Sequence, residues 1–160
     1  MALKLKFYQV VLFIVPLLLV SIVSCNSQNQ EAQENQVIVE MVTTSGIEDD
    51  YTFSVTLRSP DLGCQQYADW WEVITVDGKL IYRRILTHSH VNEQPFTRSG
   101  GKVKINSNQE VIVRAHMNNM GYGVQAMIGT TKSGFQTKLL EKDFAELLEA
   151  TEPLPDGCTH

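Results

Sequence analysis

The segment between Trp70 and Leu86 constrains the fold more than any other feature of this sequence. Two runs rich in β-branched and aromatic residues, 70–76 and 80–86, flank the dipeptide Asp77-Gly78. This dipeptide tolerates the positive φ angles of a two-residue β-turn. The sequence therefore predicts an antiparallel β-hairpin.

A two-residue turn at this place also predicts which residues of the hairpin face one another. Glu72 then pairs with Arg83, so that opposite charges lie on paired positions. Trp71 pairs with Arg84, which places a cation opposite an indole. Large apolar side chains fall on both faces of this hairpin, since Trp70 and Trp71 point to opposite sides. We expect either that another part of the chain covers the second face, or that one indole is exposed.

Further short strands are predicted by alternating polarity between turn signals. In residues 51–58 the side chains of Tyr51, Phe53, Val55 and Leu57 share one face. The other predicted strands are residues 37–43, 103–105, 110–117 and 122–128, and Gly100-Gly101 is expected to interrupt the pattern before residue 103. In residues 110–117 the inward face is predicted to carry Val111, Val113, Ala115 and Met117, with Ile112, Arg114 and His116 on the other side. About seven short strands predict an all-β fold, an antiparallel β-sandwich that resembles immunoglobulin or fibronectin type III domains. That resemblance concerns architecture and implies no function.

The C-terminal segment has helical rather than alternating spacing. Leu140, Phe144, Leu147 and Leu148 follow the i, i+4, i+7, i+8 pattern of one helical face. We therefore expect a short amphipathic helix that ends near Ala150 and packs on the sandwich.

The first 25 residues have the layout of an export signal. Lys4 and Lys6 precede an apolar run over residues 10–20, which is short for a membrane span. The end of this segment, Ile22-Val23-Ser24-Cys25, resembles the lipobox of bacterial lipoproteins. The resemblance implies cleavage before Cys25, lipidation of that cysteine with fatty acyl chains such as palmitate, and anchoring in the bacterial cell envelope, facing the periplasm or the cell surface. An ordinary signal peptide or an uncleaved anchor remains the alternative.

Composition suggests how the rest of the chain is divided. Residues 26–36 contain no aromatic or β-branched residue, so we interpret them as a tether that would span about 18 Å as a coil. The expected organisation is a signal peptide (1–24), a lipidated cysteine with its tether (25–36), a β-sandwich (37–131) and a helical tail (132–160). Residues 67–101 also resemble a recurrent stretch of small exported bacterial proteins to which no activity is attached.

Three cysteines in an exported chain leave one without an intramolecular partner. If Cys25 is lipidated, Cys64 and Cys158 can form a disulfide, which would stabilise the fold by roughly 4 to 5 kcal/mol in the chain-entropy model. Two free thiols are the alternative. The pair is predicted from this count and from an oxidising envelope.

The formal net charge of −5 argues against nucleic acid as a partner and against electrostatic binding to anionic lipid. We therefore expect membrane contact through the lipid alone, and an unidentified protein or small ligand as a further partner. The sequence contains no Gly-rich phosphate loop, no G-x-S-x-G and no H-E-x-x-H. An enzyme of unknown class is accordingly the third choice of function.

A metal site is the second choice. His88 and His90 are spaced so that both would project from one face of a strand, and His116, Met117 or Met120 could complete the site. Imidazole and thioether donors suit copper, or zinc through the histidines. Structural hydrogen bonding by the histidines is the alternative.

A non-catalytic binding or structural module of the envelope is the first choice. Trp, Tyr and Arg often anchor interfaces, and the hairpin and its following loop are rich in such residues. The candidate binding surface comprises Trp70, Trp71, Tyr82, Arg84, Glu93 and Arg98. The alternative is that both indoles belong to the core.

Overall fold

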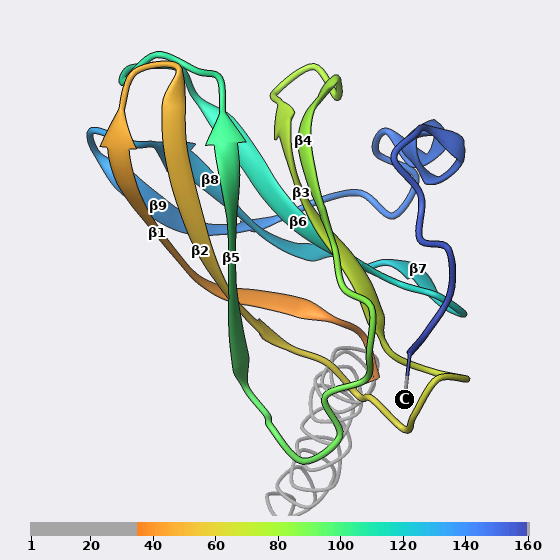
Figure 1. The fold of residues 1–160 in the computed structure, drawn as a ribbon. Helices are drawn as coiled ribbons and strands as arrows, with labels where there is room; N and C mark the ends of the chain where they lie inside the picture. Colours follow the sequence, from red (N-terminus) through yellow and green to blue (C-terminus); the bar gives the residue numbers. More distant parts are fainter. Residues whose placement is uncertain (1–34, 160) are drawn as a thin grey trace, which may run out of the picture. The chain divides into compact units, whose positions relative to one another are not determined.

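A computed structural model of the protein describes residues 35–159 (Figure 1). The predicted signal peptide, the lipobox and nearly all of the tether lie outside these residues. The secondary structure elements are β1 (Ile38–Ile47), β2 (Asp50–Arg58), β3 (Ala68–Thr75), β4 (Leu80–Ile85), β5 (Phe96–Val103), β6 (Val111–Met117), β7 (Gly121–Tyr122), β8 (Gln125–Thr130), β9 (Gly134–Leu139) and the 3-10 helix η2 (Glu146–Ala150). Among the described residues no helix is long and apolar enough to cross a membrane.

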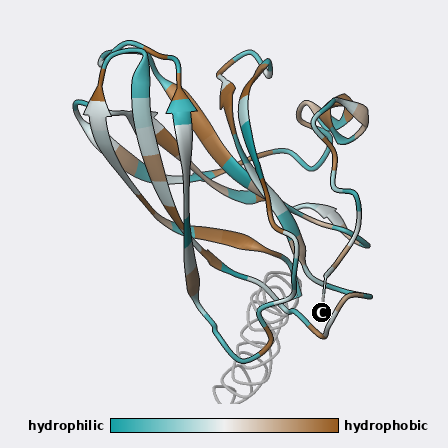
Figure 2. Cartoon of the chain, in the orientation of Figure 1, coloured by the Kyte–Doolittle hydropathy of each residue, from teal (hydrophilic) through white to brown (hydrophobic). Residues whose placement is uncertain are grey.

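Two antiparallel sheets face one another, which confirms an all-β sandwich. The 3-stranded sheet has the order β1-β2-β5, and the 6-stranded sheet has the order β4-β3-β6-β8-β9, with β7 paired to β6. Hydrophobic residues recur along the strands of both sheets (Figure 2). The inward faces of β2 and β6 are those that the alternation predicts, and Phe53, Val55, Leu57 and Val113 are all 0% exposed. These side chains form the core between the sheets.

The predicted hairpin register is confirmed over most of its length. Glu72 pairs with Arg83 and Trp71 pairs with Arg84. The two-residue turn is wrong, however, because Thr75 is bonded to Lys79 across a three-residue loop in which Gly78 has a φ of 82°. A bulge between Val73 and Ile74 compensates for the extra loop residue, so the predicted pairs are restored beyond it.

The strand after the histidine-containing segment begins earlier than predicted. β5 runs over Phe96–Val103 and includes Gly100 and Gly101, which we expected to interrupt the pattern. A Cβ atom on Gly100 would lie 2.5 Å from the Tyr82 hydroxyl and 3.1 Å from the Trp71 ring. Glycine therefore permits close packing inside this strand instead of ending it.

The sandwich also extends further along the chain than the predicted boundary at residue 131. β9 pairs with β8 along its whole length, from Thr130 and Gly134 to Gln125 and Leu139. Its side chains are mostly exposed at the edge of the sheet, and the alternation that marks the other strands is accordingly weak. The predicted boundary is therefore corrected to Leu139.

The segment after β9, residues 140–159, crosses the outer face of the 6-stranded sheet, and we call it the strap. Its predicted helix starts only at Glu146, because Ala145 has a left-handed conformation with a φ of 50°. Leu140, Phe144 and Leu148 pack on Ile74 and Ile112 as predicted. Leu147 instead is 83% exposed, since a 3-10 helix does not keep the α-helical spacing.

Beneath the strap, two arginines share one buried carboxylate. Arg83 donates hydrogen bonds from Nε and Nη2 to Glu72 Oε2 over 2.8 and 2.6 Å, and Arg114 donates from Nε to Glu72 Oε1 over 2.8 Å. Aromatic rings cover both guanidinium groups: that of Arg83 lies 4.5 Å from the Trp70 ring centroid, and that of Arg114 lies 3.4 Å from the Tyr122 ring centroid.

The remaining guanidinium N–H groups bind the main chain of the strap. Arg83 donates to the carbonyl oxygens of Leu148, Thr151 and Pro153, and Arg114 donates to those of Phe144 and Ala145. The strap is thus the cover for the second face of the hairpin, and both indoles are buried. The sequence predicted only one of these two ion pairs. The hairpin register places Arg83 opposite Glu72, but nothing in the sequence indicates that Arg114 is the second partner of Glu72.

Candidate functional site

Three loops meet at one end of the sandwich, which extends from the bottom to the right-hand side of Figure 1, and we call this the loop end. They are residues 59–67 between β2 and β3, residues 86–95 between β4 and β5, and residues 118–120 between β6 and β7. The C-terminal residues up to Thr159 join them, because Thr159 donates from N and Oγ1 to the carbonyl oxygen of Thr87. The loop end is the best candidate for a functional site, since it combines loops with a surface hollow.

Asp61 joins the first loop to the second. Its Oδ1 accepts hydrogen bonds from Ser59 Oγ at 2.6 Å and from Ala68 N at 3.0 Å. Its Oδ2 accepts from His90 N at 2.7 Å and from Ser89 Oγ at 3.4 Å. Asp61 is 6% exposed, so these donors compensate for the loss of water around a buried carboxylate.

Asn118 joins the first loop to the third. Its Oδ1 accepts from Tyr67 N at 3.0 Å, and its Nδ2 donates to the carbonyl oxygen of Cys64 at 3.1 Å. Asn119 Nδ2 adds a bond of 3.2 Å to Gln66 Oε1. The loops are therefore held by specific hydrogen bonds, which fixes their relative positions before any partner binds.

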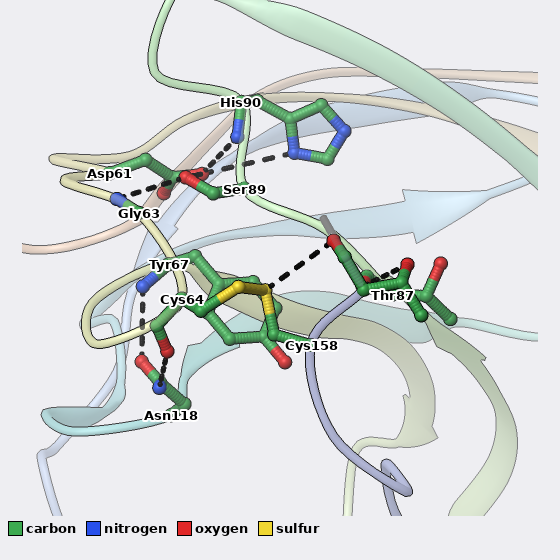
Figure 3. Close-up of a disulfide and its surroundings, with 10 residues drawn as sticks. Asp61, Gly63, Cys64, Tyr67, Thr87, Ser89, His90, Asn118 and Cys158 are labelled. Carbon is green, nitrogen blue, oxygen red and sulfur yellow. Dashed lines mark hydrogen bonds and ion pairs between the residues drawn. A yellow bond between two sulfur atoms is a disulfide. The ribbon is translucent and has the colours of Figure 1, made fainter.

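The structure contains the predicted disulfide between Cys64 and Cys158, with their Cα atoms 5.5 Å apart. Figure 3 shows the disulfide with Thr87 to its right and the loop that carries Asp61 to its upper left. A hollow of about 410 Å³ opens next to the disulfide. The residues that line it are Gly63, Cys64, His88, Ser89 and Thr159.

His88 and His90 lie next to one another, with ring centroids 4.6 Å apart. His88 is exposed. His90 is 3% exposed and stacks on Phe96 with a centroid distance of 3.7 Å. Burial, together with the nearby charges of Arg98 and His88, lowers the pKa of His90 from 6.5 to about 4. Within the described part of the chain neither ring nitrogen of His90 has a hydrogen-bond partner.

The other predicted metal ligands have different surroundings. His116 stacks on Trp70 with a centroid distance of 3.6 Å, and its Nδ1 lies 2.7 Å from Asp69 Oδ1. Met117 is buried in the core, and Met120 is 40% exposed on the third loop. Among residues 35–159 no group of three or more His, Cys, Asp or Glu side chains could hold a metal ion. The structure therefore does not bring the predicted set together, and only the His88–His90 pair remains.

The predicted binding surface on the hairpin is wrong in its main members. Trp70 is 3% exposed and Trp71 is 0% exposed, so neither indole can anchor a partner. Tyr82 is half-buried and packs against Trp71. Arg84 is exposed, but the cation that lies over an indole is Arg83.

Glu93 and Arg98 lie near the loop end and form an ion pair with an N–O distance of 2.7 Å. They are the two predicted surface residues that remain available at the candidate site. Sequence analysis did not indicate the loop end itself, because Asp61, Cys64 and Asn118 lie far apart along the chain and only the fold brings them together.

The fold and site define a disulfide-linked, mostly antiparallel β-sandwich with three hydrogen-bonded loops at one end. Among known proteins, the chain is similar to one from Halomicrobium mukohataei named "Putative lipoprotein", with 46% identity over 82 residues. The matched region is 51% of this chain and 40% of that protein, so the chain spans less than half of its relative. No family model and no solved structure matches the chain. The relative supports the resemblance to lipoproteins.

Proposed function

We propose that this protein is a lipid-anchored binding module of the cell envelope with a non-catalytic role. The observation that carries the proposal is the lipobox sequence that ends at Cys25, in a chain with a relative named as a lipoprotein. A disulfide between Cys64 and Cys158 agrees with an exported domain, because such bonds persist in oxidising compartments.

We infer further that the sandwich is of the immunoglobulin or fibronectin III type. Strands β1, β2 and β5 correspond in order to strands A, B and E of that architecture, and β3, β6 and β8 correspond to C, F and G. In this assignment the first and third loops of the loop end are the B–C and F–G loops. These loops carry recognition in variable domains.

The loop end is the proposed recognition surface. Its loops are joined by the side chains of Asp61 and Asn118, so little conformational entropy is lost when a partner binds. Loops positioned by a rigid scaffold commonly bind ligands, and the hairpin face that the sequence favoured is covered by the strap.

The anchor is tested with the full-length chain expressed in a lipoprotein-processing host. We expect mass spectrometry to find cleavage before Cys25 and a diacylglyceryl group on its sulfur, and we expect detergent-phase partitioning that a Cys25→Ser variant loses. A Cys64→Ser/Cys158→Ser variant is the matched control and should keep its lipid. An intact, unmodified Met1 on the native protein would overturn the proposal.

Copper or zinc binding at His88 and His90 is a second candidate. The observation that favours it is the 4.6 Å separation of the two rings, together with the absence of a hydrogen bond at either ring nitrogen of His90 among the described residues. The nearest acidic group is Asp61, whose Oδ2 lies 3.8 Å from His90 Nδ1. Calorimetric titration with each metal should show heat that a His88→Ala/His90→Ala variant loses, whereas Asn92→Ala on the same loop keeps it. Equal heats from all three proteins would eliminate this candidate.

A further inference from the structure

Each of the three loops at the loop end presents one exposed large apolar side chain. Leu62 on the first loop is 76% exposed, Val91 on the second is 49% exposed, and Met120 on the third is 40% exposed. We call these three residues the apolar tips. Single exposed apolar residues are common on protein surfaces, but one on each of three connected loops is a pattern that calls for a ligand.

The same loops carry little exposed negative charge, although the whole chain is acidic. Asp61 and Glu93 are the carboxylates of the three loops. Asp61 is buried, and Glu93 is paired with Arg98. The opposite end of the sandwich, which we call the distal end, instead carries exposed acids. They are Glu48, Asp49, Asp50, Asp77 and Glu110. Asp50 and Asp77 form ion pairs with Lys102 and Lys79, whereas Glu48, Asp49 and Glu110 have no ion pair to a lysine or arginine among the described residues.

The described chain begins at the loop end. In β1, Ile38 pairs with Arg58, the last residue of β2, from which the first loop departs. Just before β1, the side chain of Gln36 accepts a hydrogen bond from Val124 N, close to β7. A lipid on Cys25 would therefore be connected to the loop end and not to the distal end.

The length of the segment between Cys25 and Asn35 favours an orientation with the loop end, and not the distal end, toward the membrane. From Cys25 to Asn35 the chain can span at most about 33 to 36 Å when fully extended. The ten residues of β1 alone span about 33 Å from the loop end to the distal end. Turning the distal end onto the membrane would therefore need an almost fully stretched connection, whereas the loop end can approach the membrane without that entropic cost.

We propose that the loop end docks on the surface of the bilayer that holds the lipid anchor, with Leu62, Val91 and Met120 in contact with the interfacial region. This inference rests on the proposed lipidation of Cys25 and names the ligand of the proposed recognition surface. The anchor makes docking intramolecular, and a short linker between two binding sites gives effective concentrations in the millimolar range. The weak affinity of a few apolar side chains is then sufficient.

Single tryptophan substitutions test this contact, because the native indoles of Trp70 and Trp71 are 3% and 0% exposed. The lipidated full chain, carrying Leu62→Trp, is reconstituted in vesicles of phosphatidylcholine brominated on its acyl chains. We expect a loss of the added tryptophan emission relative to vesicles of unbrominated phosphatidylcholine. Val91→Trp and Met120→Trp should behave alike.

Ile47→Trp is the matched control, since Ile47 is an apolar residue 73% exposed at the distal end. Its added emission should be unchanged by bromine and quenched by aqueous iodide. If the indole at position 62 is open to iodide and insensitive to bromine on vesicles that carry the protein, the docking proposal is overturned while the anchor stands. If the protein does not float with the vesicles at all, the anchor fails and the docking proposal fails with it.

Discussion

Glu72 shows how one residue organises the outer face of the larger sheet. Its carboxylate lies on β3 between Arg83 of β4 and Arg114 of β6, and all three side chains are almost fully buried. Buried charges are costly unless they are paired and hydrogen-bonded. Because Glu72 holds both guanidinium groups, their other N–H groups remain directed at the strap.

Replacing Glu72 with glutamine should therefore destabilise the fold strongly. The variant leaves two buried guanidinium groups without a counter-charge, for which we expect a loss of about 3 to 5 kcal/mol in unfolding free energy. Urea denaturation measures it. Glu146→Gln on the exposed face of η2 is the control and should change stability by less than about 0.5 kcal/mol. Equal stability of the two variants would contradict the role assigned to Glu72.

His90 makes stability depend on pH in a direction that follows from its burial. The pKa of His90 is about 4 in the folded state against 6.5 for an ordinary histidine, so the unfolded chain binds more protons between these values. The folded state should lose about 3 kcal/mol of stability as the pH falls from 6.5 to 4. Well above pH 6.5, where both states are neutral at His90, this residue contributes no pH dependence.

This prediction is checked by measuring unfolding free energies at several pH values for the wild type and for His90→Phe. The difference between the two proteins isolates His90 from the carboxylates that titrate in the same range. We expect this difference to change steeply between pH 6.5 and 4. A constant difference would show that His90 titrates normally in the folded state.

At the scale of elements, the strap is, with the edge strand β9, one of the least buried parts of the fold. None of its residues is buried, so it is retained by the arginine bonds to its carbonyl groups and by the disulfide at its end. Elements with few buried contacts open most easily.

Removal of the disulfide in a Cys64→Ser/Cys158→Ser variant should loosen the strap. We expect a loss of up to about 4 to 5 kcal/mol in unfolding free energy from the chain-entropy model. Amide exchange should accelerate most in residues 140–159, and Trp70 should become accessible to iodide while Trp71 stays shielded. Uniform acceleration over the whole sandwich would contradict a separate opening of the strap.

Gly100 allows β5 to pack closely against Tyr82 of β4 and Trp71 of β3, and this contact can be tested. Gly100→Ala places a methyl group against Tyr82 and Trp71, and overpacking of this kind typically costs about 1 to 3 kcal/mol. Thermal denaturation measures the change. Ser99→Ala, at an exposed position of the same strand, is the control and should lose only the contribution of its bond to Ser54.

At the scale of the whole molecule, the two sheets share one continuous core. The buried side chains of β1, β2 and β5 pack directly against those of β3, β6 and β8. With the disulfide intact we expect residues 35–160 to unfold in a single transition. Far-ultraviolet circular dichroism and tryptophan fluorescence should give coincident curves, and separate midpoints would contradict a single cooperative unit.

The sequence by itself determined most of the strands, the inward faces of β2 and β6 and the hairpin register beyond the turn, because side-chain alternation and turn residues are local properties. It also predicted the pairing of Cys64 with Cys158, from the cysteine count together with an oxidising envelope. The alternation of Val111, Val113 and Ala115 predicted the core face of β6 directly. Ile112 and Arg114 on the other face were predicted to point away from the core, but their burial could not be foreseen.

Only the tertiary structure decided that burial, because it depends on the strap, which joins the sheet from residues distant in sequence. The same reason applies to the loop end. Asp61, His90 and Asn118 come together through long-range contacts that leave no local pattern. The two glycines of β5 were misinterpreted for the same reason. Gly100 and Gly101 suggested a break in the strand, whereas Gly100 lies within the strand because Tyr82 and Trp71 leave no room there for a larger residue.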